Sequence, residues 1–340
     1  MIDLALLRDG ISGYRGRPVR LMEVCGSHTA AVMRYGIRSI LPDSVRLISG
    51  PGCPVCAADE AYLRSAAGLA GEARLMSFGD MARSVRLCCP DAPVETVLSP
   101  LAAVEEAACH PDERIVFLSV GFETTNPVCA LSVLKAKALG LTNFSLLVCN
   151  KRMPPILEHL AAGDAGIDGY LLPGHVCAVS GTGFYEEFCR KYRVKGCVAG
   201  FDPEQILGAL YVLLLGSESF YNGYSYVKRE GSPRAMAAVE EVFEPCAAVV
   251  RGLGPIPGAG LRLRDKYADY DAARIYRMAG GGSAETAGCR CGDVICGRIT
   301  PEECPLFGIR CRPEEPKGPC MISSEGTCAA YYDYGERRPV

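Results

Sequence analysis

The chain has 340 residues, which exceeds what one hydrophobic core usually organises, so we expect two or three domains. Its 36 basic and 39 acidic side chains give a formal net charge of −3 without any block of like charge, which argues against a nucleic-acid partner or an acidic membrane surface. The N-terminus is charged and no apolar run reaches the ~18 residues of a membrane helix, so we expect neither a signal peptide nor a membrane span, and a protein of the reducing cytoplasm.

Short β-branched or leucine-rich runs alternate with longer stretches rich in alanine and leucine. The predicted strands are 19–24, 45–49, 73–77, 94–98, 114–120, 144–149, 167–172 and 196–199. Predicted helices between them include 57–70, 101–109 and 128–139. This alternation is typical of parallel sheets joined by right-handed crossovers. We therefore predict an α/β protein with two similar modules of four strands each, over residues 1–112 and 113–227.

Most of the predicted strands end in a short signature rich in glycine, proline or cysteine. In open parallel sheets, ligands bind beyond the carboxyl ends of the strands. Signatures gathered at that edge of both modules therefore predict a cleft between the modules, with loops from each side facing one site. The signatures begin at Cys25, Gly50, Phe78, Gly121, Asn150, Pro173 and Gly200.

Three cysteines follow the first two predicted strands. Cys53 and Cys56 form a C-x-x-C at the start of a predicted helix, where backbone N–H groups favour the thiolate. Cys25 ends the preceding strand, and convergence of the three thiolates would give a soft site for iron, copper(I) or zinc. The alternatives are a metal-free redox pair and inert buried cysteines. His28 is a candidate ligand, proton donor or hydrogen-bond orienter, with an indirect role favoured over ligation.

A carboxylate follows the fifth predicted strand. Glu123, with Thr124 and Thr125, could hydrogen-bond a small anionic ligand or protonate a reacting group. For the two threonines the alternative is a helix cap. His175 is a further site candidate, whereas Asp202 is expected to cap the helix that follows it.

The C-terminal segment is rich in cysteine. A tyrosine-rich connector (220–227) and a Gly/Pro segment (252–260) lead into it, and we predict a third domain over residues 228–340. Seven of the 19 cysteines lie in the last 52 residues, without the paired C-x2-C spacing of a zinc ribbon. So many thiols favour an iron–sulfur cluster with additional redox thiols over a zinc site or structural disulfides. These cysteines are Cys289, Cys291, Cys296, Cys304, Cys311, Cys320 and Cys328.

Six motifs occur in the order in which one known family carries them, between residues 22 and 334. They begin at Met22, Gly50, Gly121, Pro173, Gly200 and Pro319. Together they resemble the HypD family of [NiFe]-hydrogenase maturation factors. The resemblance implies two similar α/β domains, a [4Fe–4S] domain, and a scaffold that acts with HypC and HypE proteins. Such a scaffold assembles an Fe(CN)2CO unit, which passes to the hydrogenase large subunit.

The resemblance also implies residue roles. Cys25, Cys53 and Cys56 match the iron-site and redox cysteines, and His28 and Glu123 match residues that assist them. In the C-terminal segment the resemblance assigns two sets of thiols. The cluster ligands are Cys289, Cys304, Cys311 and Cys328, and the dithiol/disulfide pair is Cys291 with Cys320.

Three positions depart from the family pattern. Ala30 stands where many members carry a polar residue or histidine, and Cys177 stands where serine is usual. Cys296 is an additional cysteine and an alternative cluster ligand. The rival function is an iron–sulfur thiol/disulfide oxidoreductase acting on a protein partner. A small-molecule α/β enzyme is disfavoured, because the sequence has no phosphate-cradling glycine loop and no nucleophile elbow.

Overall fold

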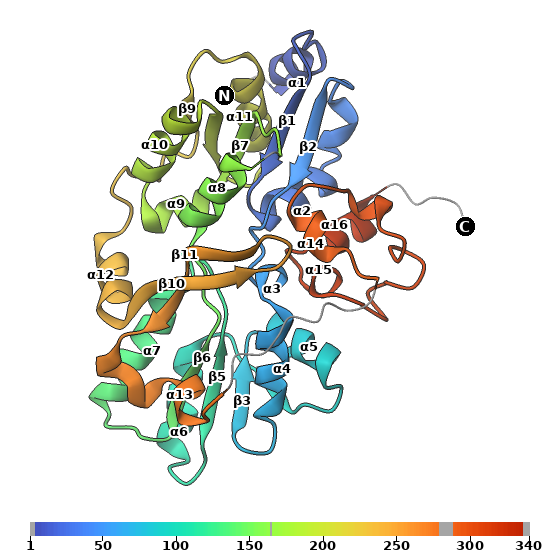
Figure 1. Cartoon of the computed structure of the whole chain (residues 1–340). Coiled ribbons are helices and arrows are strands. Elements are labelled where there is room, and N and C mark those ends of the chain that lie inside the picture. Colours follow the sequence, from blue (N-terminus) through green and yellow to red (C-terminus); the bar gives the residue numbers. More distant parts are fainter. Residues whose placement is uncertain (1–3, 164, 279–287, 336–340) are drawn as a thin grey trace.

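The computed structural model describes residues 4–163, 165–278 and 288–335 of the chain. It is an α/β structure with two parallel sheets, one above the other in Figure 1. The larger sheet has five strands in the order β2-β1-β7-β8-β9, and every neighbouring pair is parallel. Its strands are Val19–Glu23 (β1), Val45–Ser49 (β2), Gly169–Pro173 (β7), Lys195–Ala199 (β8) and Phe220–Asn222 (β9).

The second sheet has four parallel strands in the order β4-β3-β5-β6. Every residue of the central strand β5 is buried, as is every residue of β7 in the larger sheet. Burial on both faces is typical of parallel strands covered by helices on each side. The strands of this sheet are Arg74–Ser77 (β3), Val94–Thr96 (β4), Ile115–Ser119 (β5) and Phe144–Val148 (β6).

The eight predicted strands are all present, but their predicted grouping by chain order is wrong. The chain places β1 and β2 in one sheet, builds β3 to β6 into the other, and returns to the first sheet at β7. Residues 1–112 and residues 113–227 therefore each contribute strands to both sheets. Hydrogen bonds such as that from Val24 N to Leu171 O join parts of the chain that are far apart in sequence. The local amino-acid composition predicts that a segment forms a buried strand, but it does not predict which other strand pairs with that segment.

Helices cover both faces of both sheets. On the five-stranded sheet, α1, α2 and α11 pack on one face and α8, α9 and α10 on the other. On the four-stranded sheet, α4 and α5 pack on one face and α6 and α7 on the other. The bounds for the first sheet are Leu4–Ser12 (α1), Gly26–Arg34 (α2), Met153–Ala162 (α8), Gly174–Ser180 (α9), Gly183–Tyr192 (α10) and Pro203–Leu215 (α11). Those for the second are Glu60–Gly68 (α4), Gly79–Cys88 (α5), Pro100–Cys109 (α6) and Asn126–Ala138 (α7).

The segment after β9 adds a helix and a hairpin to the α/β part. Helix α12 (Pro233–Val242) and strands β10 (Phe243–Val250) and β11 (Gly254–Leu263) contribute to the core of the four-stranded sheet. The hairpin runs across the region between the two sheets (Figure 1), where Arg152 N donates to Ala259 O. The expected Gly/Pro connector is therefore mostly a β-strand. After it come the short helices η2 (Asp265–Tyr270) and α13 (Ala272–Ile275).

The cysteine-rich segment consists of short helices joined by loops, and lies beside α2, α3 and α5 (Figure 1). Val294, Ile295 and Met321 belong to one buried cluster with residues of α4 and α5. The segment therefore buries apolar side chains against the four-stranded sheet. Its helices are α14 (Cys291–Ile295), η3 (Pro301–Glu303), α15 (Pro319–Ile322) and α16 (Thr327–Tyr334). Helix α3 spans Pro54–Ala57, and a 3-10 turn, η1, spans Ile37–Ile40.

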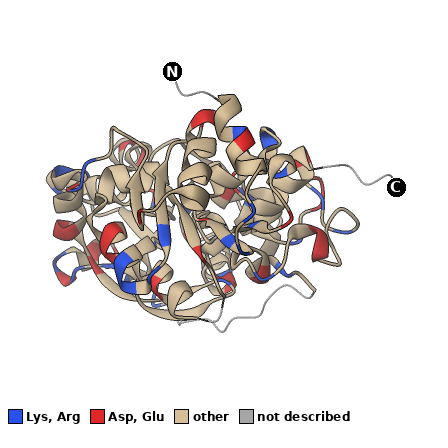
Figure 2. Ribbon diagram, turned by 90° about the horizontal axis from the view of Figure 1, so that it is seen from above, with Lys and Arg blue, Asp and Glu red and all other residues tan. Residues whose placement is uncertain are grey.

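Charged residues of both signs are interspersed along the described ribbon (Figure 2). Arg38 links the five-stranded sheet to the cysteine-rich segment through an ion pair on one side and an aromatic ring on the other. Glu23 is fully buried at the end of β1 and pairs with Arg38 at 2.9 Å, and the Arg38 guanidinium lies over the ring of Tyr331 in α16.

Within the described residues, no helix combines the length and the apolar character needed to cross a membrane.

Candidate functional site

The loop that follows β2 lies directly against the residue that follows β1. Because β1 and β2 are neighbouring parallel strands, their carboxyl ends lie side by side. Gly52 has no side chain to separate the two loops, and a Cβ atom there would come within 2.6 Å of the Cα atom of Cys25. Only glycine permits so close an approach of two backbones. Gly52 thus brings the backbone of Cys25 next to the C-x-x-C segment.

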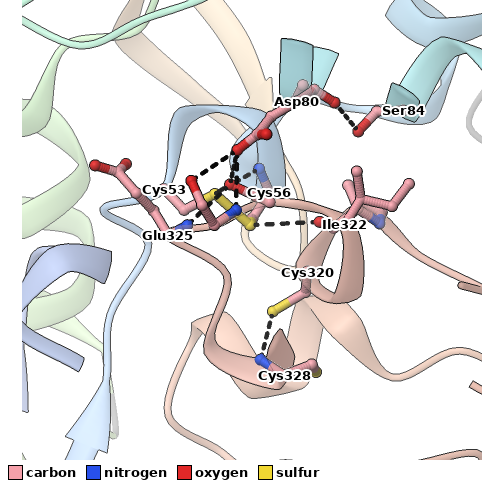
Figure 3. Close-up of a disulfide and its surroundings, with 12 residues drawn as sticks. Cys53, Cys56, Asp80, Ser84, Cys320, Ile322, Glu325 and Cys328 are labelled. Atoms are coloured by element: carbon pink, nitrogen blue, oxygen red, sulfur yellow. Dashed lines mark hydrogen bonds between the residues drawn. A yellow bond between two sulfur atoms is a disulfide. The ribbon is translucent and has the colours of Figure 1, made fainter. Parts of the chain in front are cut away.

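Cys53 and Cys56 are joined by a disulfide at the start of α3 (Figure 3). Their Cα atoms are 5.2 Å apart, and the backbone N–H of Cys56 donates to the Sγ atom of Cys53 at 3.1 Å. Both side chains are buried, with exposed fractions of 3% and 0%. A metal is bound by thiolates, so this pair can act as a metal ligand only after its disulfide has been reduced.

Cys25 occupies the N-cap position of α2 and is partly exposed. Ser27 donates a hydrogen bond to Glu325 Oε1 at 2.9 Å, which holds the loop between α15 and α16 over this helix end. Burial and the negative charge of Glu325 raise the pKa of Cys25 to about 11. The sequence predicted thiolates at all three cysteines. At Cys25, burial and the charge of Glu325 outweigh the stabilisation of a thiolate by the helix N-terminus, so without a metal the thiol stays protonated at neutral pH.

His28 lies fully buried in the first turn of α2. Its Nε2 atom is 2.9 Å from Gly200 O, and since a carbonyl only accepts, Nε2 carries the proton. Burial lowers the pKa of His28 to about 4, so the ring is neutral at pH 7. Among the described residues, Nδ1 has no hydrogen-bond partner. The ring of Phe201 stacks on the His28 ring, with 4.6 Å between the ring centroids. The ring of His175, an exposed residue, has its centroid 4.4 Å from that of Phe201.

Glu123 follows β5 and is buried. Its Oε1 accepts from Met153 N at 2.8 Å, whereas Oε2 has no partner within the described part of the chain. Burial raises the pKa of Glu123 to about 7. Burial, and then the charge of Glu123, raise the pKa of Cys177 in α9. Thr125 is at the N-cap of α7, but its side chain makes no capping hydrogen bond.

Asp80 links the four-stranded sheet to the loop above the disulfide (Figure 3). Its Oδ2 accepts from Ser323 Oγ at 3.0 Å, from Ser324 N at 2.9 Å and from Ser324 Oγ at 3.1 Å. Arg83 pairs with Oδ1 at 2.6 Å and donates to Ile322 O at 3.1 Å. Sequence reasoning noted the Phe-Gly-Asp signature after β3 but gave Asp80 no role. It also missed Ser323, whose Oγ lies 3.3 Å from Cys53 Sγ.

The thiols of the cysteine-rich segment, apart from Cys296, line one cavity. Their neighbours there are apolar residues such as Val294, Phe307 and Met321. A set of thiols in apolar surroundings fits a [4Fe–4S] cluster, because each iron of such a cluster takes one thiolate. The thiols of the cavity are Cys289, Cys291, Cys304, Cys311, Cys320 and Cys328.

Four of these thiols lie near enough to one another to shift each other's pKa. Cys291 affects the pKa of Cys289 and of Cys320, and the backbone N–H of Cys328 donates to Cys320 Sγ at 3.2 Å. The contact with Cys291, and then burial, raise the pKa of Cys289 far above its ordinary value. The structure thus brings together Cys291 and Cys320, the expected dithiol pair, although the division into ligands and redox thiols stays a prediction.

Cys296 lies outside this group. It is buried, but it lines a different cavity together with Arg20, His159 and Arg298. The Cys296 sulfur could therefore bind a metal cluster in the thiol cavity only if the cysteine-rich segment rearranged. The structure gives no support to Cys296 as an alternative ligand.

Arg251, at the turn of the hairpin, connects the two groups of cysteines. Its N–H donates to Ala57 O at 3.2 Å and its Nε to Ala58 O at 3.1 Å, next to Cys56. The following residue, Gly252, lies against Gly292 so closely that a Cβ on Gly292 would come within 2.8 Å of it. Sequence reasoning missed Arg251, because the segment around it resembled a flexible connector.

No three His, Cys, Asp or Glu side chains surround a single-ion position in the part of the chain that the structure describes. At Cys25, Cys53 and Cys56, two of the three sulfurs are joined in a disulfide. In the thiol cavity, a cluster would distribute its ligands over several irons instead of one ion. The predicted ligand sets therefore remain predictions.

Comparison with known proteins gives a single consistent family. The family model described as "HypD: Hydrogenase formation hypA family" matches residues 7–335. The hydrogenase expression/formation protein HupD of Azotobacter chroococcum is 39% identical, over 95% of this chain and 91% of that protein. The hydrogenase maturation factors HypD of Azotobacter vinelandii and Escherichia coli are 38% and 35% identical, over 95% and 94% of this chain and 91% and 90% of their own lengths. This chain therefore belongs to the HypD family of hydrogenase maturation factors.

Proposed function

We propose that this chain is the scaffold on which the Fe(CN)2CO unit of [NiFe]-hydrogenase is assembled, together with HypC- and HypE-type proteins. In this proposal the iron is a cargo, held by Cys25, Cys53 and Cys56 and passed on toward the hydrogenase large subunit. The observation that carries the proposal is the close contact of Gly52 with Cys25, which brings the backbone of this partly exposed residue next to the C-x-x-C pair. Thiolates donate enough charge to hold an iron that also binds cyanide and carbon monoxide.

His28 and Glu123 are proposed to serve the ligands that are added to the iron. His28 is neutral and keeps a buried lone pair on Nδ1, so it can accept a hydrogen bond. The raised pKa of Glu123, about 7, lets its carboxyl group give or take a proton near neutral pH. Within the residues that the structure describes, each of the two side chains lacks a hydrogen-bond partner for one polar atom, and buried polar atoms without partners are uncommon in proteins.

A resident [4Fe–4S] cluster in the thiol cavity is the second part of the proposal. Its ligands would be Cys289, Cys304, Cys311 and Cys328, and when bound it supplies electrons one at a time. Cys291 and Cys320 would form a dithiol that loses two electrons and two protons as it becomes a disulfide. The Cys53–Cys56 disulfide would take up both and open to two thiols. Support comes from Pro319, whose carbonyl faces Cys56 and whose neighbour in the chain is Cys320.

Infrared spectroscopy of the protein purified with its HypC-type partner tests the scaffold. We expect absorption bands of iron-bound cyanide and carbon monoxide in the wild type and their loss in Cys25→Ala. Cys109→Ala is the matched control, because Cys109 is an exposed thiol at the end of α6. Unchanged bands in Cys25→Ala would remove this residue from the site, and absence of bands in the wild type would contradict the scaffold itself.

The rival is an iron–sulfur thiol/disulfide oxidoreductase that acts on a protein partner. The disulfide at the start of α3 favours this reading, but its burial does not, because a partner thiol must reach a sulfur atom to attack it. Reduction of the Cys53–Cys56 disulfide by thiols of the same chain does not require access from the solvent. Reduction of a partner's disulfide by a protein that shows no cyanide or carbonyl bands would favour the rival.

A further inference from the structure

Both sulfur atoms of the disulfide face oxygen atoms of one short segment, Pro319–Ser323. Ser323 Oγ lies 3.3 Å from Cys53 Sγ, and Pro319 O lies 4.0 Å from Cys56 Sγ. A carbonyl oxygen can only accept hydrogen bonds, and a disulfide sulfur has no hydrogen to give. In the oxidised state, Pro319 O therefore receives no hydrogen bond from the sulfur that it faces.

Asp80 makes Ser323 an acceptor as well. A serine hydroxyl has a single hydrogen, and Ser323 directs it to Asp80 Oδ2 at 3.0 Å. Hydrogen bonds to a carboxylate are stronger than those to neutral groups, so this orientation is the stable one. Two further bonds from Ser324 and the pair with Arg83 hold the carboxylate in place. Ser323 Oγ accepts one hydrogen bond from Glu325 N at 3.3 Å, and its remaining lone pair is left to face Cys53, in a position only 2% exposed.

We propose that Ser323, oriented by Asp80, and the carbonyl of Pro319 stabilise the reduced form of the Cys53–Cys56 pair and so set its reduction potential. On reduction the S–S bond breaks and two electrons enter. A dithiol reductant supplies them and closes into its own disulfide, and the two protons that it releases become S–H groups on Cys53 and Cys56. Cys53 then donates to Ser323 and Cys56 to Pro319. Ser323 and Asp80 are positioning residues in this step.

The arrangement also couples the state of the pair to the docking of the cysteine-rich segment. The two hydrogen bonds gained on reduction join α3 to residues 319–323. By linkage, reduction must tighten this docking by the same free energy by which the docking favours reduction. The inference deepens the redox role proposed above for Cys53 and Cys56, but it does not depend on cyanide chemistry.

The test compares Ser323→Ala with Ser324→Ala in the full chain under anaerobic conditions. Ser324 is the matched control, because its hydroxyl contacts the same carboxylate oxygen and no sulfur. After equilibration in buffers of reduced and oxidised dithiothreitol, free thiols are alkylated. The tryptic peptide 47–64, which contains only Cys53 and Cys56 as cysteines, is then analysed by mass. We expect Ser323→Ala to shift the equilibrium toward the disulfide about tenfold, or about 30 mV more negative for two electrons.

Several results would overturn the inference. One is a Ser323→Ala potential equal to that of the wild type, and another is an equal shift in Ser324→Ala, which would point to a general effect on Asp80. Amide hydrogen exchange of residues 319–326 in the wild type is a second measurement that needs no variant. We expect several-fold slower exchange in the reduced protein, and equal or faster exchange would contradict the coupling. A wild-type peptide 47–64 that never forms a disulfide would instead remove the redox role proposed for the pair.

Discussion

The two groups of cysteines in this chain differ in how they are held and in what surrounds them. The first group follows two neighbouring strands of a parallel sheet and consists of Cys25, Cys53 and Cys56. Gly52 lets the loops that carry these cysteines lie in close contact, because it has no side chain. Carboxylates, a histidine and hydroxyl groups lie nearby. The thiols of the cavity come from loops and short helices, and their other neighbours are mainly apolar. Polar groups that can move protons suit a centre where ligands are exchanged, whereas apolar surroundings suit a centre that stays in place.

The largest effect should come from removing a ligand of the proposed [4Fe–4S] cluster. We expect the wild type to contain about four iron and four sulfide ions in the cysteine-rich segment. Cys328→Ala should lose the visible charge-transfer absorption and most of the sulfide, and should destabilise the segment, because metal binding there contributes to folding. Anaerobic iron and sulfide analysis with absorption spectroscopy measures both.

The control for this experiment is Cys296→Ala, which removes a buried cysteine that lies outside the thiol cavity. It should keep iron, sulfide and absorption. Stoichiometric zinc without sulfide in the wild type would contradict the cluster, and loss of the cluster in Cys296→Ala would mean that the ligand set has been assigned wrongly.

The second largest effect concerns communication between the two groups. Cys291→Ser should keep the cluster but lose the reduction of the Cys53–Cys56 disulfide when electrons are supplied to the cluster, because the serine hydroxyl cannot exchange with a disulfide. Thiol trapping over time, followed by mass analysis of peptide 47–64, measures the rate. Equal rates in the variant and the wild type would show that the relay does not run through Cys291.

Local patterns were sufficient to predict the strands and a helix N-terminus near the C-x-x-C, but not the partners of the strands. The helix predicted over 57–70 is two helices in the structure, α3 and α4. The run Val45–Ser49 is apolar and β-branched, and a strand is found with those same bounds. Cys53 occupies the N-cap before Pro54, as a C-x-x-C between strand and helix indicates. The grouping of strands failed because pairing between β1 and β7 depends on contacts between distant parts of the chain.

Residues that act across the chain were also missed, and the reasons are physical. Asp80 and Ser323 are ordinary polar residues in sequence, and their importance arises only when the loop after α15 lies over α5. The strand β11 contains Pro255 and Pro257, which are depleted in strands. Prolines are tolerated at these two positions because β11 is an edge strand of a two-stranded hairpin, and its further bonds, to residues 150–152, lie beyond them at Ala259 and Leu261.

The third prediction tests the close contact between the strand ends. Gly52→Ala should lower the free energy of unfolding by several kcal/mol, because its Cβ would overlap the backbone of Val24 and Cys25, and backbone cannot move aside cheaply. Gly68→Ala is the matched control, since a Cβ there meets nothing within 4 Å at the end of α4. That change should be neutral or stabilise by about 0.5–1 kcal/mol. Urea midpoints measure both, and equal midpoints for the two variants would contradict the contact.

The smallest effect should be a dependence of stability on pH caused by Glu123. Its pKa in the folded chain is raised by burial from 4.5 to about 7, so the folded state holds a proton that the unfolded state has released between these values. Stability must then fall as the pH rises from 4.5 toward 7. Glu123→Gln cannot lose a proton, and its side-chain oxygen can still accept from Met153 N. We therefore expect the variant to lack this fall.

The difference between the wild type and Glu123→Gln should grow by roughly 1–3 kcal/mol between pH 5 and pH 7, from ~1.4 kcal/mol per pKa unit with a reduction for partial hydration. His28 has the opposite dependence, because burial lowers its pKa to about 4 and the folded state then loses stability as the pH falls below 6.5. Both proteins contain His28, so its contribution cancels in the difference. Urea unfolding at a series of pH values measures the curve. Parallel curves for the two proteins would mean that Glu123 is ionised in the folded chain at pH 5 and cannot supply a proton near pH 7.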